Sequence, residues 1–119
     1  TLIISSLKDQ KEFDLVSKQG KKLHTAYFIL ILAKNFTNII LSSTNTLFFG
    51  MKVSRKLGKA VIRNKIKRRI RHLVRLISKI PQFDQYNWGM TIIPKKGFEK
   101  VNFATLLKEL EEILYKYKS

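Results

Sequence analysis

The chain has no cysteine, two prolines and two histidines among its 119 residues, and only 8 acidic residues against 24 lysines and arginines. The absence of cysteine excludes a disulfide framework and a thiolate zinc site, and His24 and His72 alone cannot form a metal cluster. The longest apolar run, residues 26–33, predicts a strand, because a membrane-spanning helix needs roughly 20 residues. The N-terminal residues lack the features of a secretory signal, so we expect a cytoplasmic protein that acts away from membranes.

Acidic residues are also absent between Asp14 and Asp84, and this gap contains the most basic part of the chain. Like charges four residues apart destabilise a helix by about 0.2–0.5 kcal/mol per pair, so stability gives no reason for a row of them. Binding to a polyanion would explain the row, because each phosphate that a cation neutralises releases condensed counterions and so favours binding. With a net charge of +16, the row predicts a nucleic-acid-binding surface. It consists of Lys59, Arg63, Lys67, Arg71 and Arg75.

Hydrophobic patterns predict one α+β domain over residues 1–119 without linkers or repeats, and 45% apolar residues can fill one core. Ser5 or Ser6 is the expected cap of the first helix, with Gly20 at its end, and Asn102 is the expected cap of the last. The predicted order is αβββαβα, in which the three consecutive strands form a meander. The expected ranges are residues 5–18 (helix), 23–33, 39–42 and 46–54 (strands), 58–80 (helix ended by Pro81), 86–93 (strand) and 102–118 (helix).

The long helix has one narrow apolar face, predicted to pack on the sheet, and is otherwise basic. Arginine offers a planar fork for two phosphate oxygens, whereas lysine acts as a point charge. Asn64 is the one neutral polar residue in the basic row; its amide could bond a base edge, a 2′-hydroxyl or a neighbouring side chain. We expect His72 to be a partly exposed surface residue and Trp88 to be core. The apolar face consists of Ile62, Ile66, Ile70, Leu73 and Ile77.

Residues 57–71, Leu-Gly-Lys-Ala-Val-Ile-Arg-Asn-Lys-Ile-Lys-Arg-Arg-Ile-Arg, closely resemble the signature helix of the bacterial ribonuclease P protein subunit. Phe13, Gly20, the strand at residues 28–32 and the closing amphipathic helix extend the resemblance over nearly the whole chain. The resemblance implies an αβββαβα sandwich with a four-stranded sheet and a left-handed βαβ crossover. The general rule for such crossovers favours the opposite hand.

The resemblance also implies a mechanism. In that family a separate RNA hydrolyses a phosphodiester with bound Mg²⁺ and releases the 5′ leader of precursor tRNA, while the protein assists. We therefore expect the catalytic RNA and precursor tRNA as partners, Mg²⁺ as a cofactor held through the RNA, no small-molecule substrate, and no catalytic or metal-binding residue in the protein. The residues agree, since the few acids lie mostly towards the two ends and form no ligand-spaced cluster of the kind a metal-dependent nuclease needs.

Two surfaces follow when the family's functional positions are carried over. A cleft between the first helix and one face of the sheet would hold the single-stranded leader, because aromatic faces stack on unpaired bases whatever their sequence. Family members often have an aromatic residue at the position of Ser17 and a tyrosine at that of Ile31, which implies fewer stacks here. The helix pattern alone allows Phe13 to be a core residue instead. The RNA-binding surface would comprise Arg55, Lys56, Lys59, Arg63, Asn64, Lys65, Lys67, Arg68 and Arg71, and the leader cleft Phe13, Ser17, Tyr27, Ile29 and Ile31.

The main alternative is a ribosomal or general RNA-binding protein without a role in tRNA 5′ maturation, which would share the charge and the small size. Such a protein would not distinguish precursor from mature tRNA. A DNA-binding helix is less favoured, because no helix-turn-helix pair or dimerisation element precedes the basic helix. A membrane-surface helix is least favoured, since the apolar face is narrow and needed for the sheet.

Overall fold

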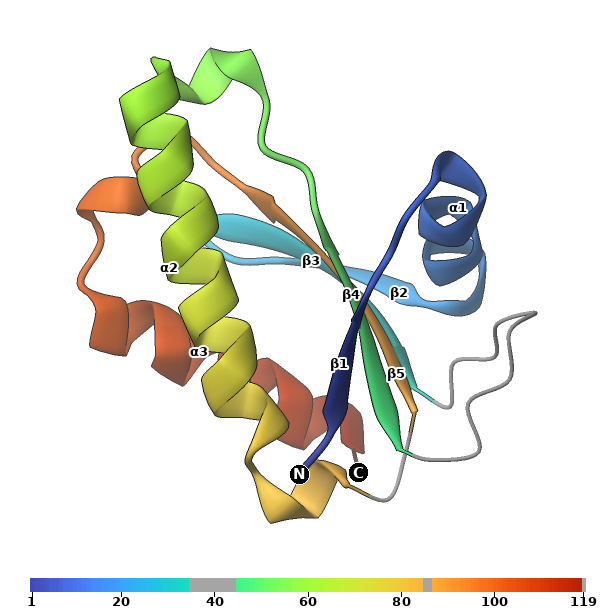
Figure 1. Ribbon diagram of the computed structural model, residues 1–119. Coiled ribbons are helices and arrows are strands. Elements are labelled where there is room, and N and C mark those ends of the chain that lie inside the picture. The colour runs from blue at the N-terminus through green and yellow to red at the C-terminus, as the bar shows by residue number, and fades with distance from the viewer. Residues whose placement is uncertain (35–44, 85–86, 119) are drawn as a thin grey trace.

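A five-stranded sheet separates helices α2 and α3 on one face from helix α1 on the other (Figure 1). This computed structural model describes residues 1–34, 45–84 and 87–118. None of the described helices is both long and apolar enough to span a membrane. The elements are β1 (Ile3–Ser6), α1 (Gln10–Gln19), β2 (Lys21–His24), β3 (Phe28–Lys34), β4 (Thr46–Met51), α2 (Ala60–Ser78), β5 (Trp88–Pro94) and α3 (Phe103–Lys118), with single 3₁₀ turns at Arg55–Leu57, Pro81–Phe83 and Phe98–Lys100.

The strands lie in the order β1-β4-β5-β3-β2, with β1, β4 and β5 parallel and β3 antiparallel to both of its neighbours. In Figure 1 the chain runs up β4, down α2 on the left of the sheet and up β5 behind β4, which makes a left-handed crossover. The expected α+β class is confirmed, although the sheet has five strands rather than four.

The predicted start of the first helix was wrong. Ser5 and Ser6 belong to β1, which pairs in parallel with β4, and the helix cap is Asp9. The Glu12 backbone N–H donates to Asp9 Oδ1 (3.0 Å), and the Glu12 carboxylate accepts from the Lys8 N–H (2.8 Å). This reciprocal pair satisfies two backbone donors, so it outweighs a serine cap further upstream.

The predicted meander was also wrong. The expected strand at residues 23–33 is a hairpin, because the Thr25 hydroxyl accepts from the backbone N–H groups of Tyr27 (3.2 Å) and Phe28 (3.0 Å) and bends the chain between β2 and β3. Strand β5 then lies between β3 and β4, so these two strands are not neighbours. The strand expected at residues 39–42 lies outside the described residues.

The main core fills the space between the sheet and the pair α2 and α3. The predicted apolar face of α2 is confirmed: Ile66 and Ile70 are fully buried, and Ile62 is half-buried at the helix start. Each fully buried side chain of this size contributes about 1.5–3 kcal/mol. The predicted Asn102 cap is also confirmed, because its side-chain oxygen accepts from the Ala104 N–H (2.9 Å). A second, smaller cluster lies under α1 and contains Leu7, Val16, Ile31, Ala33 and Phe48.

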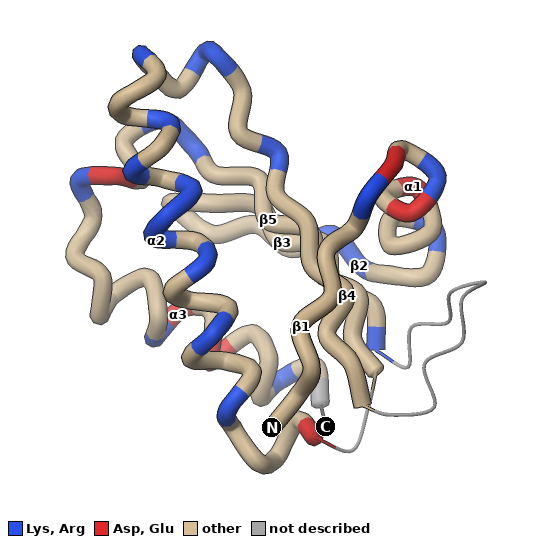
Figure 2. The backbone as a smooth tube through the Cα atoms, in the orientation of Figure 1, with Lys and Arg blue, Asp and Glu red and all other residues tan. Residues whose placement is uncertain are grey.

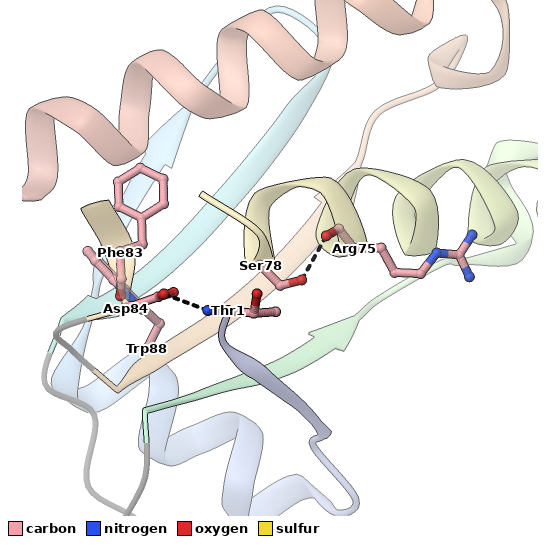
Figure 3. Close-up of polar contacts among 6 residues, drawn as sticks. All are labelled: Thr1, Arg75, Ser78, Phe83, Asp84 and Trp88. Carbon is pink, nitrogen blue, oxygen red and sulfur yellow. Dashed lines mark hydrogen bonds and ion pairs between the residues drawn. The ribbon is translucent and has the colours of Figure 1, made fainter. Parts of the chain in front are cut away.

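Polar contacts lie within the C-terminal end of α2 and between the following 3₁₀ turn and β5 (Figure 3), and the Leu2 backbone N–H donates to the Ser78 carbonyl (2.7 Å). The Ser78 hydroxyl donates to the Arg75 carbonyl (2.7 Å), and the Trp88 indole donates to the Phe83 carbonyl (3.0 Å). Trp88 is 1% exposed, which confirms it as core. The α-amino group of Thr1 pairs with Asp84 beside these contacts. The end of α2 is therefore held by its backbone and buried side chains, and the Arg75 guanidinium projects along the helix without a contact in Figure 3.

Candidate nucleic-acid interface

The start of α2 depends on a glycine. Gly58 has φ +141°, a backbone conformation that side chains with a Cβ rarely adopt, and a Cβ there would lie 2.9 Å from Ile62 Cδ1. Leu57 is buried just before this reversal, whereas Arg55 and Lys56 are exposed. The turn therefore anchors the chain by one apolar side chain and presents two cations immediately before the helix.

Lysine and arginine run along the whole of α2, and no acidic residue lies on it (Figure 2). Among the residues that the structure describes, no lysine or arginine of this helix forms an ion pair, and the Asn64 amide has no hydrogen bond. The unpaired cations therefore form one continuous surface, here named the α2 ridge. Its exposed members are Lys59, Asn64, Lys65, Arg68, Arg71 and Arg75, and Arg63 and Lys67 are half-buried at its sides.

Arg63 has an unsatisfied donor. Its Nε atom is buried and has no hydrogen-bond partner within the described ranges. A buried unpaired donor is unfavourable by about 1–3 kcal/mol. Because this atom is closed to solvent, a ligand oxygen could reach it only if the Arg63 side chain moved.

Arg69 differs from the other cations of the helix, and the sequence did not reveal this. Its guanidinium donates to the carbonyls of Phe98 (2.7 Å) and Val101 (2.5 Å). These bonds fasten the 3₁₀ turn before α3 to the middle of α2. Arg69 is therefore a structural clamp and not a free charge of the ridge.

A groove of about 390 Å³ lies beside the ridge, between α2, the edge strand β1 and α1. The Phe13 ring packs directly on Gly50, where a Cβ would lie 2.4 Å from Phe13 Cε1. Lys52 Nζ lies 5.5 Å from the centre of the same ring, within cation–π range. Arg71 and Arg75 line the groove from α2. We name it the Phe13 groove; its lining residues are Ile4, Ser6, Leu7, Phe13, Phe49, Gly50, Met51, Arg71, Val74 and Arg75.

The five residues predicted for the leader cleft do not all lie together. Phe13 lines the groove and packs on the small cluster that contains Ile31, which is 8% exposed. Ile29 is half-buried and lies on the same face of β3 as Ile31. Ser17 is exposed on α1. Tyr27 packs against the main core on the other face of the sheet, and therefore lies apart from Phe13.

Several lining residues of the groove were missing from the predicted site. Arg75 was part of the predicted basic row, which continues at four-residue spacing, but it was not among the positions carried over from the family. Ile4 and Ser6 could not have been found, since the strand that carries them was not predicted. Across the described parts of the chain, no three histidine, aspartate or glutamate side chains gather as a metal-binding group.

Comparison with known proteins identifies one family. Residues 4–118 match the family model described as Ribonuclease P. The chain is 56% identical over 112 residues to the ribonuclease P protein component of Rickettsia akari (strain Hartford), which covers 93% of this chain and 95% of that protein. It is 54% identical over 114 residues to the protein of the same name from Rickettsia prowazekii (strain Madrid E), with coverage of 95% and 94%.

The fold leads to the same family. The RNase P protein from Thermotoga maritima superposes with a TM-score of 0.70 and 32% identity, over 94% of this chain and 96% of that one. The chain therefore belongs to the family of ribonuclease P protein components, which act in tRNA processing as part of a ribonucleoprotein.

Proposed function

We propose that this chain is the subunit that binds the catalytic RNA of ribonuclease P through the α2 ridge and the 5′ leader of precursor tRNA through the Phe13 groove. The observation that carries the proposal is the junction of the two surfaces: Arg71 belongs to the ridge and also lines the groove opposite Phe13. One RNA-bound helix would thus stand beside a channel for a single strand.

The ridge supports phosphate binding because no carboxylate in the described part of the chain pairs with its cations. For a duplex, the logarithm of the binding constant falls as the logarithm of the salt concentration rises, and each neutralised phosphate makes this slope steeper by about 0.9. Arg55 and Lys56 extend the same surface before the helix starts.

The groove supports binding of an unpaired nucleotide. Its volume of about 390 Å³ falls within the range of about 300–1,000 Å³ that ligand pockets occupy. The Phe13 ring lines the groove, Lys52 Nζ lies 5.5 Å from the centre of this ring, and Arg71 and Arg75 line the groove from α2, where they could bind the phosphate. Stacking on an aromatic ring contributes about 1–3 kcal/mol per base without a sequence requirement, which suits an enzyme that accepts many leaders.

Under this proposal the RNA carries out the hydrolysis with Mg²⁺, and the protein supplies binding. The cations of the ridge would replace part of the Mg²⁺ that neutralises crowded phosphates, so the protein would lower the Mg²⁺ concentration needed for cleavage. Ile31 would support Phe13 from the cluster under α1, whereas Ile29 and Ser17 are not among the residues that line the groove.

The test is leader release from precursor tRNA by a bacterial ribonuclease P RNA at low Mg²⁺, with and without this protein. We expect rapid cleavage only when both components are present, and none with the protein alone. Folded protein that binds the RNA but does not accelerate cleavage would refute the proposal and favour a general RNA-binding protein.

A further inference from the structure

A second recess lies on the other flank of α2, against the start of α3. It has a volume of about 260 Å³ and is lined by Arg68, Arg69, His72, Arg75 and Phe103. None of these residues is acidic, and the nearby cap of α3 is the neutral Asn102. Arg75 also lines the Phe13 groove, so the two hollows stand on opposite sides of the ridge.

Aromatic contacts fix the floor of this recess. The imidazole of His72 stacks on the Phe103 ring with 4.6 Å between centroids and 24° between planes. The Arg69 guanidinium carbon lies 5.9 Å from the centre of the same ring, and its nitrogens are held by two backbone carbonyls. Phe103 is half-buried and packs on the main core. The exposed His72 ring is therefore held in place before any ligand arrives.

The charges around the recess are free. Arg68 and Arg75 are exposed, and neither forms an ion pair with a residue in the described ranges. A flat ring between two free guanidiniums matches the parts of one nucleotide, because bases stack on aromatic and histidine rings while arginine binds phosphate. A base that stacks on His72 must be unpaired and unstacked from its neighbours, which excludes a base within a regular duplex.

We infer that this recess holds an unpaired nucleotide of the catalytic RNA, with its base stacked on His72 and its flanking phosphates on Arg68 and Arg75. The inference rests on the proposed function, because it takes the RNA on the α2 ridge as its partner. The catalytic RNA is the source that the geometry favours, since the recess opens on the flank of α2 away from the groove assigned to the leader.

The experiment measures the affinity of the protein for a bacterial ribonuclease P RNA over a series of salt concentrations. We compare H72A with H72F, which keeps a stacking ring, and with H24A, which removes the other exposed histidine on strand β2. We expect H72A to weaken binding about tenfold, as for one lost base stack, with an unchanged salt dependence. H72F should bind within about threefold of the parent, and R68A should lower the salt slope by about one contact.

Chemical probing of the RNA identifies the nucleotide that binds in the recess. One unpaired nucleotide should be protected by the parent protein and by H72F, and should become reactive with H72A. Equal affinities and equal protection with H72A and H24A would overturn the inference. A loss of affinity confined to precursor tRNA would overturn the choice of the catalytic RNA as partner.

The two proposals fail differently. If the parent protein accelerates leader release and H72A behaves as H24A does, the recess is not a nucleotide site and the proposed function stands. If H72A weakens RNA binding but the parent protein never accelerates leader release, the recess stands and the proposed function falls. Thermal unfolding of each variant shows that its fold is kept; if H72A unfolds early, H72L replaces it, because leucine covers the Phe103 ring without offering an aromatic face, and it should weaken RNA binding as H72A does.

Discussion

The contact between Phe13 and Gly50 permits a direct test of the groove. In the G50A variant the new Cβ would lie 2.4 Å from Phe13 Cε1 and 2.5 Å from Phe13 Cζ. The third close atom is the Cδ1 tip of Leu7 at 2.9 Å, which a small rotation can move. The aromatic ring must therefore leave its place for the alanine to fit.

The expected magnitude follows from overpacking, which destabilises a protein by about 1–3 kcal/mol. F13A alone should destabilise by about 2 kcal/mol, less than the 3–5 kcal/mol of a fully buried phenylalanine, because Phe13 is only half-buried. The double variant F13A/G50A removes the clash. We expect it to be more stable than the sum of the single effects predicts by about 1–2 kcal/mol.

Urea unfolding of the parent protein, F13A, G50A and F13A/G50A measures this coupling energy. Binding of precursor and mature tRNA by the reconstituted holoenzyme measures the effect of the same variants on function. F13A and G50A should each lower the preference for precursor over mature tRNA about tenfold, as for one lost base stack, and F13A/G50A should lower it no further than F13A does. Additive unfolding energies within about 0.5 kcal/mol would refute the packing argument. An unchanged tRNA preference in stable F13A would show that Phe13 serves only the core.

Four other substitutions separate structural from binding roles, all followed by urea unfolding and by RNA binding across salt concentrations. R68A should lower the salt slope of RNA binding by about 0.9 and change the free energy of unfolding by no more than about 0.5 kcal/mol. R69M should lower the free energy of unfolding by about 2 kcal/mol, because two hydrogen bonds to carbonyls are lost, and should leave the salt slope unchanged. The reverse pattern would contradict the assignment of Arg69 as a clamp. D9A should lose about 1 kcal/mol with the cap of α1, and an unchanged midpoint would disprove that role. G58A should lose about 1–3 kcal/mol because of its backbone conformation, and a neutral result would show that the turn before α2 can relax.

Local signals in the sequence were sufficient for the two long helices. The apolar face of α2 repeats over five positions, and Pro81 follows the helix, so its length and its buried side could be predicted. Asn102 is a strong cap followed by leucines at helical spacing, and it is confirmed in that role. Both elements are specified within their own segments, which is the reason that prediction succeeded there.

The sheet could not be predicted in the same way, because strand pairing depends on distant segments. Strand β1 has only four residues, and Ile3 and Ile4 are 56% and 39% exposed, so it lacks the alternating pattern of a half-buried strand. The position of β5 between β3 and β4 follows from the crossover of α2, which no residue within β5 encodes. The Phe13 groove was hidden for the same reason, since β1 forms one of its walls.

The roles of single cations in α2 also depend on distant segments of the chain, so they could not be predicted from the sequence. Arg68 and Arg69 are adjacent and identical in type; the predicted RNA-binding surface includes Arg68 and not Arg69, but nothing in the sequence shows that Arg69 has a structural role. The fold separates them: Arg69 donates to two carbonyls in the segment before α3, while Arg68 stays exposed at the edge of the recess with His72. Because the clamp holds α3 against α2, it also holds Phe103 under His72. One arginine thus builds the recess in which its neighbour would bind RNA, and only the tertiary structure assigns the two roles.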